Sequence, residues 1–156
     1  MKQTTPSIGP RGQVGIEWRD ELKTILVTAG MIIEQGKVLV TQRKEGAPHG
    51  LLWEFPGGKV MEGEEPRGAL RRELKEELDI DAEVGMIFEA VFHPYPEHPV
   101  LLLIYLCRIE KGTPKCLGCH DLRWVNLIDL EKLAMPPADN PVRKRLCSSK
   151  GFIEAL

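Results

Sequence analysis

Residues 57–80, GGKVMEGEEPRGALRRELKEELDI, decide how this chain is interpreted. Pro66 suits the first turn of a helix, and apolar residues follow it at helical spacing. These apolar positions are Ala69, Leu70, Leu74 and Leu78. On such a helix Glu73, Glu76 and Glu77 project their carboxylates from one face, because residues three and four positions apart are neighbours. Like charges placed this way destabilise a helix by roughly a few tenths of a kcal/mol per exposed pair. We therefore expect a cation to offset their repulsion.

A solvated acidic helix face is the simpler interpretation of these glutamates, since Lys75 and Arg71 lie nearby. The context favours a metal site instead. A Gly-Gly turn precedes the helix, Glu64 lies in the approach to it, and Arg72 stands beside the first carboxylate. Clustered oxygen ligands suit Mg²⁺, which takes one or a few carboxylates and leaves its other positions to water and substrate phosphates.

These residues resemble the signature of the Nudix hydrolases. That signature is a glycine, five residues, a glutamate, seven residues, and then Arg-Glu-aliphatic-x-Glu-Glu-x-Gly-aliphatic. One position departs, because Asp79 stands where the family usually has glycine. Asp tolerates the left-handed conformation that ends a helix better than most residues, so we expect the metal ligands to be unaffected. The matching residues are Gly58, Glu64, Arg72, Glu73, Leu74, Glu76, Glu77 and Ile80.

Length and composition fit a single domain. The chain has 156 residues, of which 42% are hydrophobic and 28% charged, and its net charge is −2. We expect a peripheral, flexible arm over residues 1–22 and one domain over residues 23–156. No apolar run approaches the roughly 20 residues that a membrane helix needs, and the first residues do not resemble a signal peptide. We therefore expect a cytoplasmic protein with no membrane partner and no direct nucleic-acid partner.

The pattern of the remaining chain predicts an α/β fold. Two β-like runs enclose the Glu34-Gln35-Gly36 turn, which indicates a hairpin. Strands flanked by helices on both sides indicate an α/β/α sandwich, and the resemblance implies the same layers around a mixed β-sheet. The predicted strands are residues 25–33, 37–43, 51–55, 82–93, 100–109 and 122–127, and two further predicted helices are residues 128–135 and 140–156.

A Nudix reaction requires Mg²⁺, with Mn²⁺ as a possible substitute, to neutralise a polyphosphate and to activate water. The three glutamates of the predicted helix are the expected ligands, and the resemblance adds the backbone carbonyl of Gly57. Glu64 is the next candidate, as a ligand through water or in proton transfer. The resemblance implies that Arg72 orients Glu73, although an ordinary ion pair with Glu76 is the alternative.

A closer resemblance, to the MutT-like nucleoside triphosphate pyrophosphohydrolases, covers residues 24–146. It rests on LLWEFPGGKV at 51–60, RWV at 123–125 and PPADNP at 136–141. By position, Phe55 and Tyr95 would pack on the nucleobase, Asp139 would hydrogen-bond its edge, and Arg43 would approach the phosphates or the base. Phe55 could instead be a core aromatic residue, and Asp139 or Asn140 could merely cap the last helix.

Three positions depart from the guanine-oxidation type of this branch. Asp139 replaces an Asn, and His98 stands where an Arg often contacts the base. Because an ionised Asp accepts but cannot donate, a pyrimidine such as CTP is an alternative to an oxidised nucleotide such as 8-oxo-dGTP. Gly118 stands where the resemblance implies a glutamate. If that glutamate serves as the base in relatives, Glu64, His120 or Asp121 must act here, or the rate is low.

The segment CLGCH at 116–120 allows several interpretations. It matches the pattern of c-type haem attachment, which occurs after export. A zinc site would need a fourth ligand, for which Cys107 or His98 is available. We expect a loop with two reduced thiols, and a half-buried Cys147 on the last helix. Four scattered cysteines argue against a disulfide scaffold.

Three classes of function follow. The first is Mg²⁺-dependent hydrolysis of nucleoside triphosphates to monophosphate and pyrophosphate, which would clean oxidised or surplus nucleotides from the pool and so assist DNA repair. The second is a Nudix domain that binds a nucleotide without cleaving it, against which the intact glutamates count. The third is another Nudix chemistry, on nucleotide sugars, ADP-ribose or dinucleotides, against which the short chain and the PPAD segment count.

Overall fold

The computed structural model describes residues 23–149 and residue 151, so the predicted arm over residues 1–22 lies outside the described residues. The strands are β1 (Ile25–Glu34), β2 (Lys37–Gln42), β3 (Trp53–Glu54), β4 (Gly57–Lys59), β5 (Asp81–Pro94), β6 (Pro99–Lys111) and β7 (Asp121–Val125). The helices are α1 (Pro66–Leu78), α2 (Leu127–Lys132) and α3 (Asn140–Ser148). None of these three helices is long and apolar enough to cross a lipid bilayer.

The strands form one mixed sheet in the order β3-β2-β1-β6-β5, with β4 added to β1 and β7 added to β2. β1 and β6 run parallel, whereas the other pairs are antiparallel. The predicted hairpin joins β1 to β2, and its two turn residues, Gln35 and Gly36, have φ angles of 50° and 73°. This pairing confirms the predicted mixed sheet.

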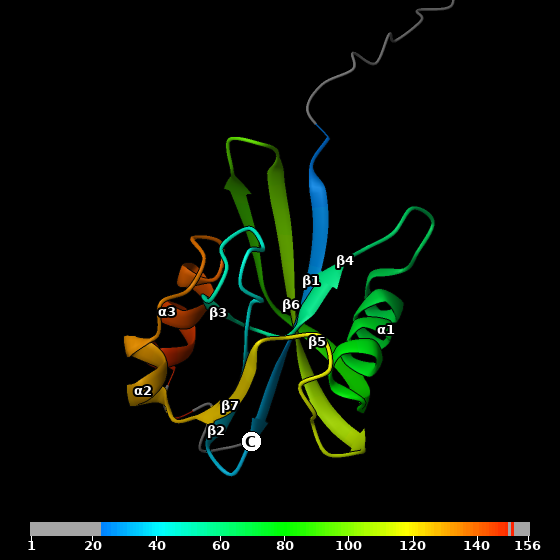
Figure 1. The fold of residues 1–156 in the computed structure, drawn as a ribbon. Helices are drawn as coiled ribbons and strands as arrows, with labels where there is room; N and C mark the ends of the chain where they lie inside the picture. The colour runs from blue at the N-terminus through cyan, green and yellow to red at the C-terminus, as the bar shows by residue number, and fades with distance from the viewer. Residues whose placement is uncertain (1–22, 150, 152–156) are drawn as a thin grey trace, which may run out of the picture.

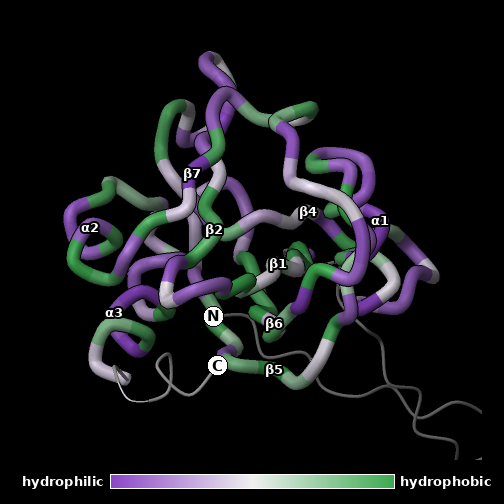
Figure 2. Tube along the Cα trace, turned by 90° about the horizontal axis from the view of Figure 1, so that it is seen from below, coloured by the Kyte–Doolittle hydropathy of each residue, from purple (hydrophilic) through white to green (hydrophobic). Residues whose placement is uncertain are grey.

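Helices cover both faces of the sheet, with α1 on one side and α2 and α3 on the other (Figure 1). The apolar stripe of α1 packs with Ile32 of β1 and Tyr105 of β6 in one core cluster. Val142 and Leu146 of α3 belong to a second core cluster. Seen from below, the hydrophobic segments of the trace include strands that lie between α1 on one side and α2 and α3 on the other (Figure 2). The α/β/α sandwich is therefore confirmed.

Helix α1 begins and ends as its sequence predicts. The Glu65 carboxylate accepts hydrogen bonds from the backbone N–H groups of Arg67 and Gly68, and Pro66 follows it in the first turn. Asp79 ends the helix with φ 55° and ψ 39°, so it adopts the left-handed conformation of the glycine it replaces. The four predicted apolar positions are buried, which directs the opposite face and its glutamates away from the core.

Gly57 and Gly58, which were predicted to form a turn, belong to strand β4, and this strand lies against both β1 and α1. A Cβ atom on Gly57 would lie 2.0 Å from the carbonyl oxygen of Thr28. A Cβ atom on Gly58 would lie 2.4 Å from the carboxyl carbon of Glu73. Both distances are shorter than a Cβ contact allows. At position 57 the clash is with backbone, so only glycine fits, whereas at position 58 a side chain would displace the Glu73 carboxylate.

Gly57→Ala should destabilise the fold by about 1–3 kcal/mol or more, because the rigid backbone of β1 must move to accept the methyl group. Gly68→Ala is the matched control. Its Cβ would meet Glu65 at 3.7 Å, an ordinary contact, and alanine favours helix by about 0.8–1 kcal/mol. Urea unfolding of both variants measures the difference, and equal midpoints would contradict the close approach of β4 to β1.

Candidate active site

The Arg72 guanidinium gathers the carboxylates of α1 and of the preceding loop. Its Nε and Nη2 atoms donate to the two oxygens of Glu64 at 2.7 and 3.0 Å. Its Nη1 atom donates to Glu73 at 2.9 Å and to Glu76 at 3.3 Å. The contact with Glu73 and the alternative ion pair with Glu76 thus coexist. Arg72 fixes the position of Glu73, whose side chain is only 14% exposed.

Glu64 is an ionised anchor in this arrangement. Besides the two bonds from Arg72, it accepts a hydrogen bond from the backbone N–H of Met61 at 3.0 Å. The hydrogen bond from Arg72, followed by that from Met61, lowers the pKa of Glu64 to about 2. A carboxylate with so low a pKa is a weak proton acceptor near neutral pH. This environment counts against the predicted role in proton transfer.

Glu77 has the opposite environment. Burial, and then the charges of Glu73 and Glu54, raise its pKa to about 7, against smaller effects of Lys44 and Arg43. Carboxylates from α1 and β3 therefore face a common region in which negative charge is in excess. Such a region is suited to a cation, which would displace the proton from Glu77.

The donor set fits Mg²⁺ in its chemistry, because all the predicted ligands are oxygen atoms. Gly57 lies on β4 opposite Ala29, beside the glycine that contacts Glu73. The side chains are not closed around a point, however. Among residues 23–149 and 151, no three His, Cys, Asp or Glu side chains are gathered closely enough to enclose an ion. In this structure Arg72 pairs with Glu73 and Glu76 instead.

Arg43 and Glu54 form a pair that lies next to this region. Arg43 donates to Glu54 at 2.8 Å and to the carbonyl of Pro48 at 2.6 Å, which ties the loop after β2 to β3. Burial raises the pKa of Glu54, and Arg43 partly opposes that shift. Glu54 is not among the site residues predicted from the sequence. Its signal is an acidic residue between Trp53 and Phe55, two buried aromatic residues.

Asp139 is buried and faces the same pair. Only 7% of it is exposed, and it accepts a hydrogen bond from the backbone N–H of Phe55. Burial and the charge of Glu54 raise the pKa of Asp139 to about 8. It occupies the N-cap position of α3 but makes no capping hydrogen bond, so the capping alternative is wrong. Phe55 is 2% exposed and belongs to the core, as its alternative interpretation held.

Tyr95 lies beside Asp139, and the rings of two histidines lie near its own ring. Its hydroxyl accepts a hydrogen bond from the backbone N–H of Ala138 at 3.0 Å. The rings of His49 and His93, which the sequence analysis did not single out, lie 5.1 and 4.3 Å from its ring centre. His98 is exposed in the turn between β5 and β6, and none of the contacts described above involves it.

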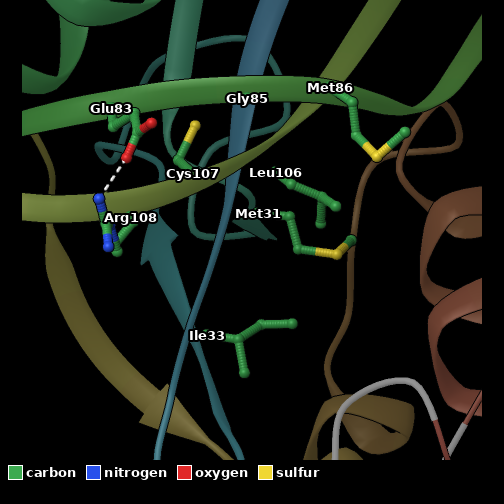
Figure 3. Close-up of a pocket in the computed structure, with 8 residues that line it drawn as sticks. All are labelled: Met31, Ile33, Glu83, Gly85, Met86, Leu106, Cys107 and Arg108. Carbon is green, nitrogen blue, oxygen red and sulfur yellow. Dashed lines mark hydrogen bonds and ion pairs between the residues drawn. The ribbon is translucent and has the colours of Figure 1, made fainter. Parts of the chain in front are cut away.

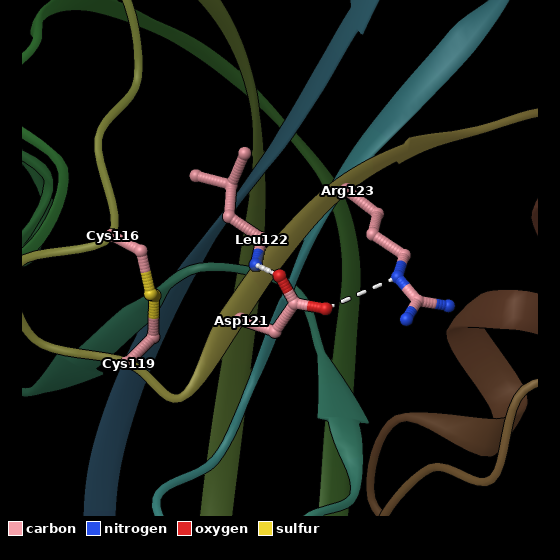
Figure 4. Close-up of a disulfide and its surroundings, with 5 residues drawn as sticks. All are labelled: Cys116, Cys119, Asp121, Leu122 and Arg123. Atoms are coloured by element: carbon pink, nitrogen blue, oxygen red, sulfur yellow. Dashed lines mark hydrogen bonds and ion pairs between the residues drawn. A yellow bond between two sulfur atoms is a disulfide. The ribbon is translucent and has the colours of Figure 1, made fainter.

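The loop before β7 differs from its prediction, because Cys116 and Cys119 form a disulfide (Figure 4). The expected pair of reduced thiols is therefore wrong for this structure. Asp121, one of the residues weighed as a base, instead accepts from Arg123 at 3.2 Å. His120 is exposed, and its backbone N–H donates to the carbonyl of Gln42. Cys147 is buried on α3 rather than half-buried.

A surface cavity of about 330 Å³ lies between β1, β5 and β6, away from these residues (Figure 3). Met31, Met86 and Leu106 line it together with the half-buried thiol of Cys107. None of the candidate site residues lines this cavity. Volume alone therefore does not identify a functional site, and the convergence of carboxylates is the reason to treat α1 and β3 as the candidate site.

The helix, the glycine turn and the carboxylates match one family of known proteins. A family model of the NUDIX domain matches residues 24–146. The chain belongs to the Nudix family. Its relatives include enzymes named diphosphatases and pyrophosphohydrolases, and the chain is a Nudix hydrolase.

Three relatives illustrate the match to this Nudix hydrolase. The CTP pyrophosphohydrolase of Escherichia coli strain K12 is 50% identical over 121 residues, which cover 78% of the chain and 90% of the relative. The 8-oxo-dGTP diphosphatase of Haemophilus influenzae is 37% identical over 125 residues, which cover 80% and 92%. The solution structure of the E. coli ORF135 protein superposes with a TM-score of 0.71 at 32% identity and covers 81% of the chain and 91% of that protein.

Glu77 should titrate near pH 7 in the metal-free Nudix hydrolase, and Glu73→Gln should lower its pKa towards 4.5, because one of the negative charges that disfavour ionisation is removed. Carbon-detected NMR of the side-chain carboxyl groups across pH 4–9 measures both. Glu131→Gln, at an exposed position on α2, is the control and should leave Glu77 unchanged. Titration of Glu77 near 4.5 in the unmodified protein would refute the excess of negative charge.

Proposed function

We propose that this Nudix hydrolase is a Mg²⁺-dependent nucleoside triphosphate pyrophosphohydrolase that releases a monophosphate and pyrophosphate. The observation that carries the proposal is the meeting of Glu73 and Glu77 of α1 with Glu54 of β3, which leaves one region in need of a cation. The intact carboxylates support hydrolysis over mere nucleotide binding. Removal of unwanted nucleotides from the cytoplasmic pool is the role that fits this reaction.

Glu73, Glu76 and Glu77 would hold the ion, together with the carbonyl of Gly57. When bound, Mg²⁺ neutralises the polyphosphate and lowers the pKa of a coordinated water. Arg72 holds the Glu73 carboxylate in place at 2.9 Å. The positive charge of Arg72 also limits repulsion within the helix before the ion and the nucleotide bind.

The opposite end of the site would receive the base. Asp139 has a pKa of about 8, so it is mostly neutral at pH 7 and can both donate and accept hydrogen bonds. Cytosine offers an N4 amino donor beside an acceptor, which complements a neutral carboxyl group. The 50% identity to a CTP pyrophosphohydrolase also favours a cytosine nucleotide as the substrate. Tyr95 would border the base on one side.

An oxidised guanine nucleotide is the second candidate substrate. The relatives named 8-oxo-dGTP diphosphatases support it. An ionised Asp139 accepts two hydrogen bonds, and the guanine edge presents its N2 amino group and a neighbouring N–H as donors. The charge on Asp139 would thus decide between the two kinds of base.

Glu76→Gln and Glu77→Gln should each lower kcat by roughly 10²–10³-fold, because each removes a ligand of the Mg²⁺ that would stabilise the negative charge of the transition state. Glu131→Gln on α2 removes an exposed carboxylate outside the site and should retain full activity. The assay measures pyrophosphate release with Mg²⁺ from a panel of normal and oxidised nucleoside triphosphates. Unfolding midpoints check that all three variants fold. Normal turnover by either site variant would contradict the roles assigned here.

The preference between cytosine and guanine nucleotides should change as pH rises through about 8. At a pH below the pKa of Asp139, the carboxyl group is protonated and favours cytosine. At a pH above it, the ionised carboxylate favours a guanine edge. The measurement is the ratio of kcat/KM values for dCTP and 8-oxo-dGTP between pH 6.5 and 9.

Asp139→Asn tests the cause of this change. An amide does not titrate in this range, so the ratio for this variant should stay constant from pH 6.5 to pH 9. A ratio that still changes with pH in the variant, or equal loss of activity on all nucleotides, would rule out reading of the base by Asp139.

A further inference from the structure

The loop between β6 and β7 closes the last turn of α1. The backbone N–H groups of Leu117 and Gly118 both donate to the carbonyl of Glu77, at 2.9 and 3.1 Å. The N–H of Lys115 donates to the carbonyl of Leu78 at 2.9 Å. Carbonyls at the end of a helix lack partners within the helix, so this loop supplies them. The backbone of Glu77 is therefore held by a segment about 40 residues further along the chain.

The same loop also packs on the side chain of Glu77. A Cβ atom on Gly118 would lie 2.7 Å from Cγ and 3.0 Å from Cβ of Glu77. The loop backbone thus forms one wall of the space that the Glu77 side chain occupies. Even an added methyl group at position 118 would displace one of the two segments.

The disulfide encloses the two residues that make these contacts. Leu117 and Gly118 are the residues between Cys116 and Cys119. Cys116 is exposed and Cys119 is half-buried, so solvent reaches the bond. Figure 4 shows the disulfide on this loop, where it joins the start and the end of the turn. Closure of the turn and the placement of Glu77 are consequently parts of one local structure.

We infer that the Cys116–Cys119 turn positions Glu77, and that reduction of its disulfide weakens the binding of a divalent cation by the enzyme. The inference rests on the proposed function, in which Glu77 is a ligand. Its physical basis is conformational entropy. The bond restricts the turn to few conformations, whereas the open dithiol allows many in which the two N–H groups no longer meet the carbonyl of Glu77.

The chemical step is thiol–disulfide exchange. In oxidation, the thiolate of Cys116 attacks a small-molecule disulfide, such as oxidised glutathione, and expels one partner thiol. The thiolate of Cys119 then attacks the mixed disulfide, so that the Cys116–Cys119 bond forms and a second partner thiol leaves. Two electrons and two protons pass to the partner. A dithiol such as dithiothreitol reverses both steps and is itself oxidised to a disulfide.

Cys107 provides the matched control. Burial raises the pKa of its thiol to about 12, so almost none of it is thiolate near neutral pH and it reacts slowly. It lies on β6 beside the cavity of Figure 3, outside the turn. Cys107→Ser should therefore leave the response to oxidation intact. In Cys116→Ser/Cys119→Ser the response should disappear, because the bond cannot form.

The test compares the full chain after treatment with oxidised glutathione and after reduction with dithiothreitol, freed of both reagents. Alkylation and mass spectrometry count the thiols in each form. Mn²⁺ binding is measured by electron paramagnetic resonance, and the Mg²⁺ dependence of pyrophosphate release is measured in parallel. Reduction should weaken Mn²⁺ binding and raise the half-saturating Mg²⁺ concentration by about tenfold, the lower end of the effect typical of residues that orient a ligand. The kcat at saturating Mg²⁺ should change little.

Two single substitutions in the turn separate positioning from stability. Gly118→Ala should weaken Mn²⁺ binding in both redox forms, because its methyl group displaces Glu77. Leu117→Ala keeps the backbone N–H and trims a side chain that is 59% exposed, so it should bind Mn²⁺ as the unmodified enzyme does. Normal binding by Gly118→Ala would overturn the positioning role.

The outcomes distinguish this inference from the proposed function. Equal Mn²⁺ affinity and equal Mg²⁺ dependence of the two redox forms would overturn the inference and leave the function standing. A response that persists in the double serine variant, or one that Cys107→Ser abolishes, would also overturn it. If neither form releases pyrophosphate from any nucleotide, the proposed function fails. Mn²⁺ affinity that depends on the disulfide would then still support the positioning of Glu77.

Discussion

The repulsion among the glutamates of α1 is the constraint on which the site depends, and Arg72 is the residue that makes it tolerable. The planar guanidinium donates two hydrogen bonds to Glu64 from one edge. Its remaining nitrogen donates to Glu73 and Glu76. A lysine has no such fork. Each exposed pair contributes little by itself. Together they hold carboxylates ready on one helix, at the cost of keeping the pKa of Glu77 near 7.

Glu54 connects the two ends of the site. Its charge raises the pKa of Glu77, where we propose that the cation binds, and also that of Asp139, where we propose that the base is read. Arg43 partly neutralises Glu54 and at the same time ties down the loop after β2. A change in the charge of Glu54 would therefore alter the pKa of both Glu77 and Asp139.

At three positions in this site, glycine has no side chain to prevent the backbone from lying close to a neighbouring residue. Gly57 and Gly58 allow β4 to touch β1 and Glu73, and Gly118 allows the disulfide turn to touch Glu77. The resemblance to MutT-like enzymes implies a glutamate at the last of these positions. In this chain a backbone wall takes the place of that side chain, which is why the turn acts on Glu77 through position rather than through charge.

Local sequence determined helix α1, its caps, the β1–β2 hairpin and the shared face of the glutamates, because these depend on residues within a few positions of one another. It also determined the family through a contiguous signature, and it allowed for Asp79 at the end of the helix. Only the tertiary structure revealed three further features. These are the ion pair between Arg43 and Glu54, the burial of Asp139 against Phe55, and the disulfide beside Glu77. The first two join segments separated in the chain or depend on how deeply a group is buried, and the spacing of residues in a single sequence records neither. For this reason the sequence left open whether Asp139 caps α3. The two cysteines lie only three positions apart, but their spacing is compatible with a disulfide as well as with two reduced thiols, and the expected thiols were wrong.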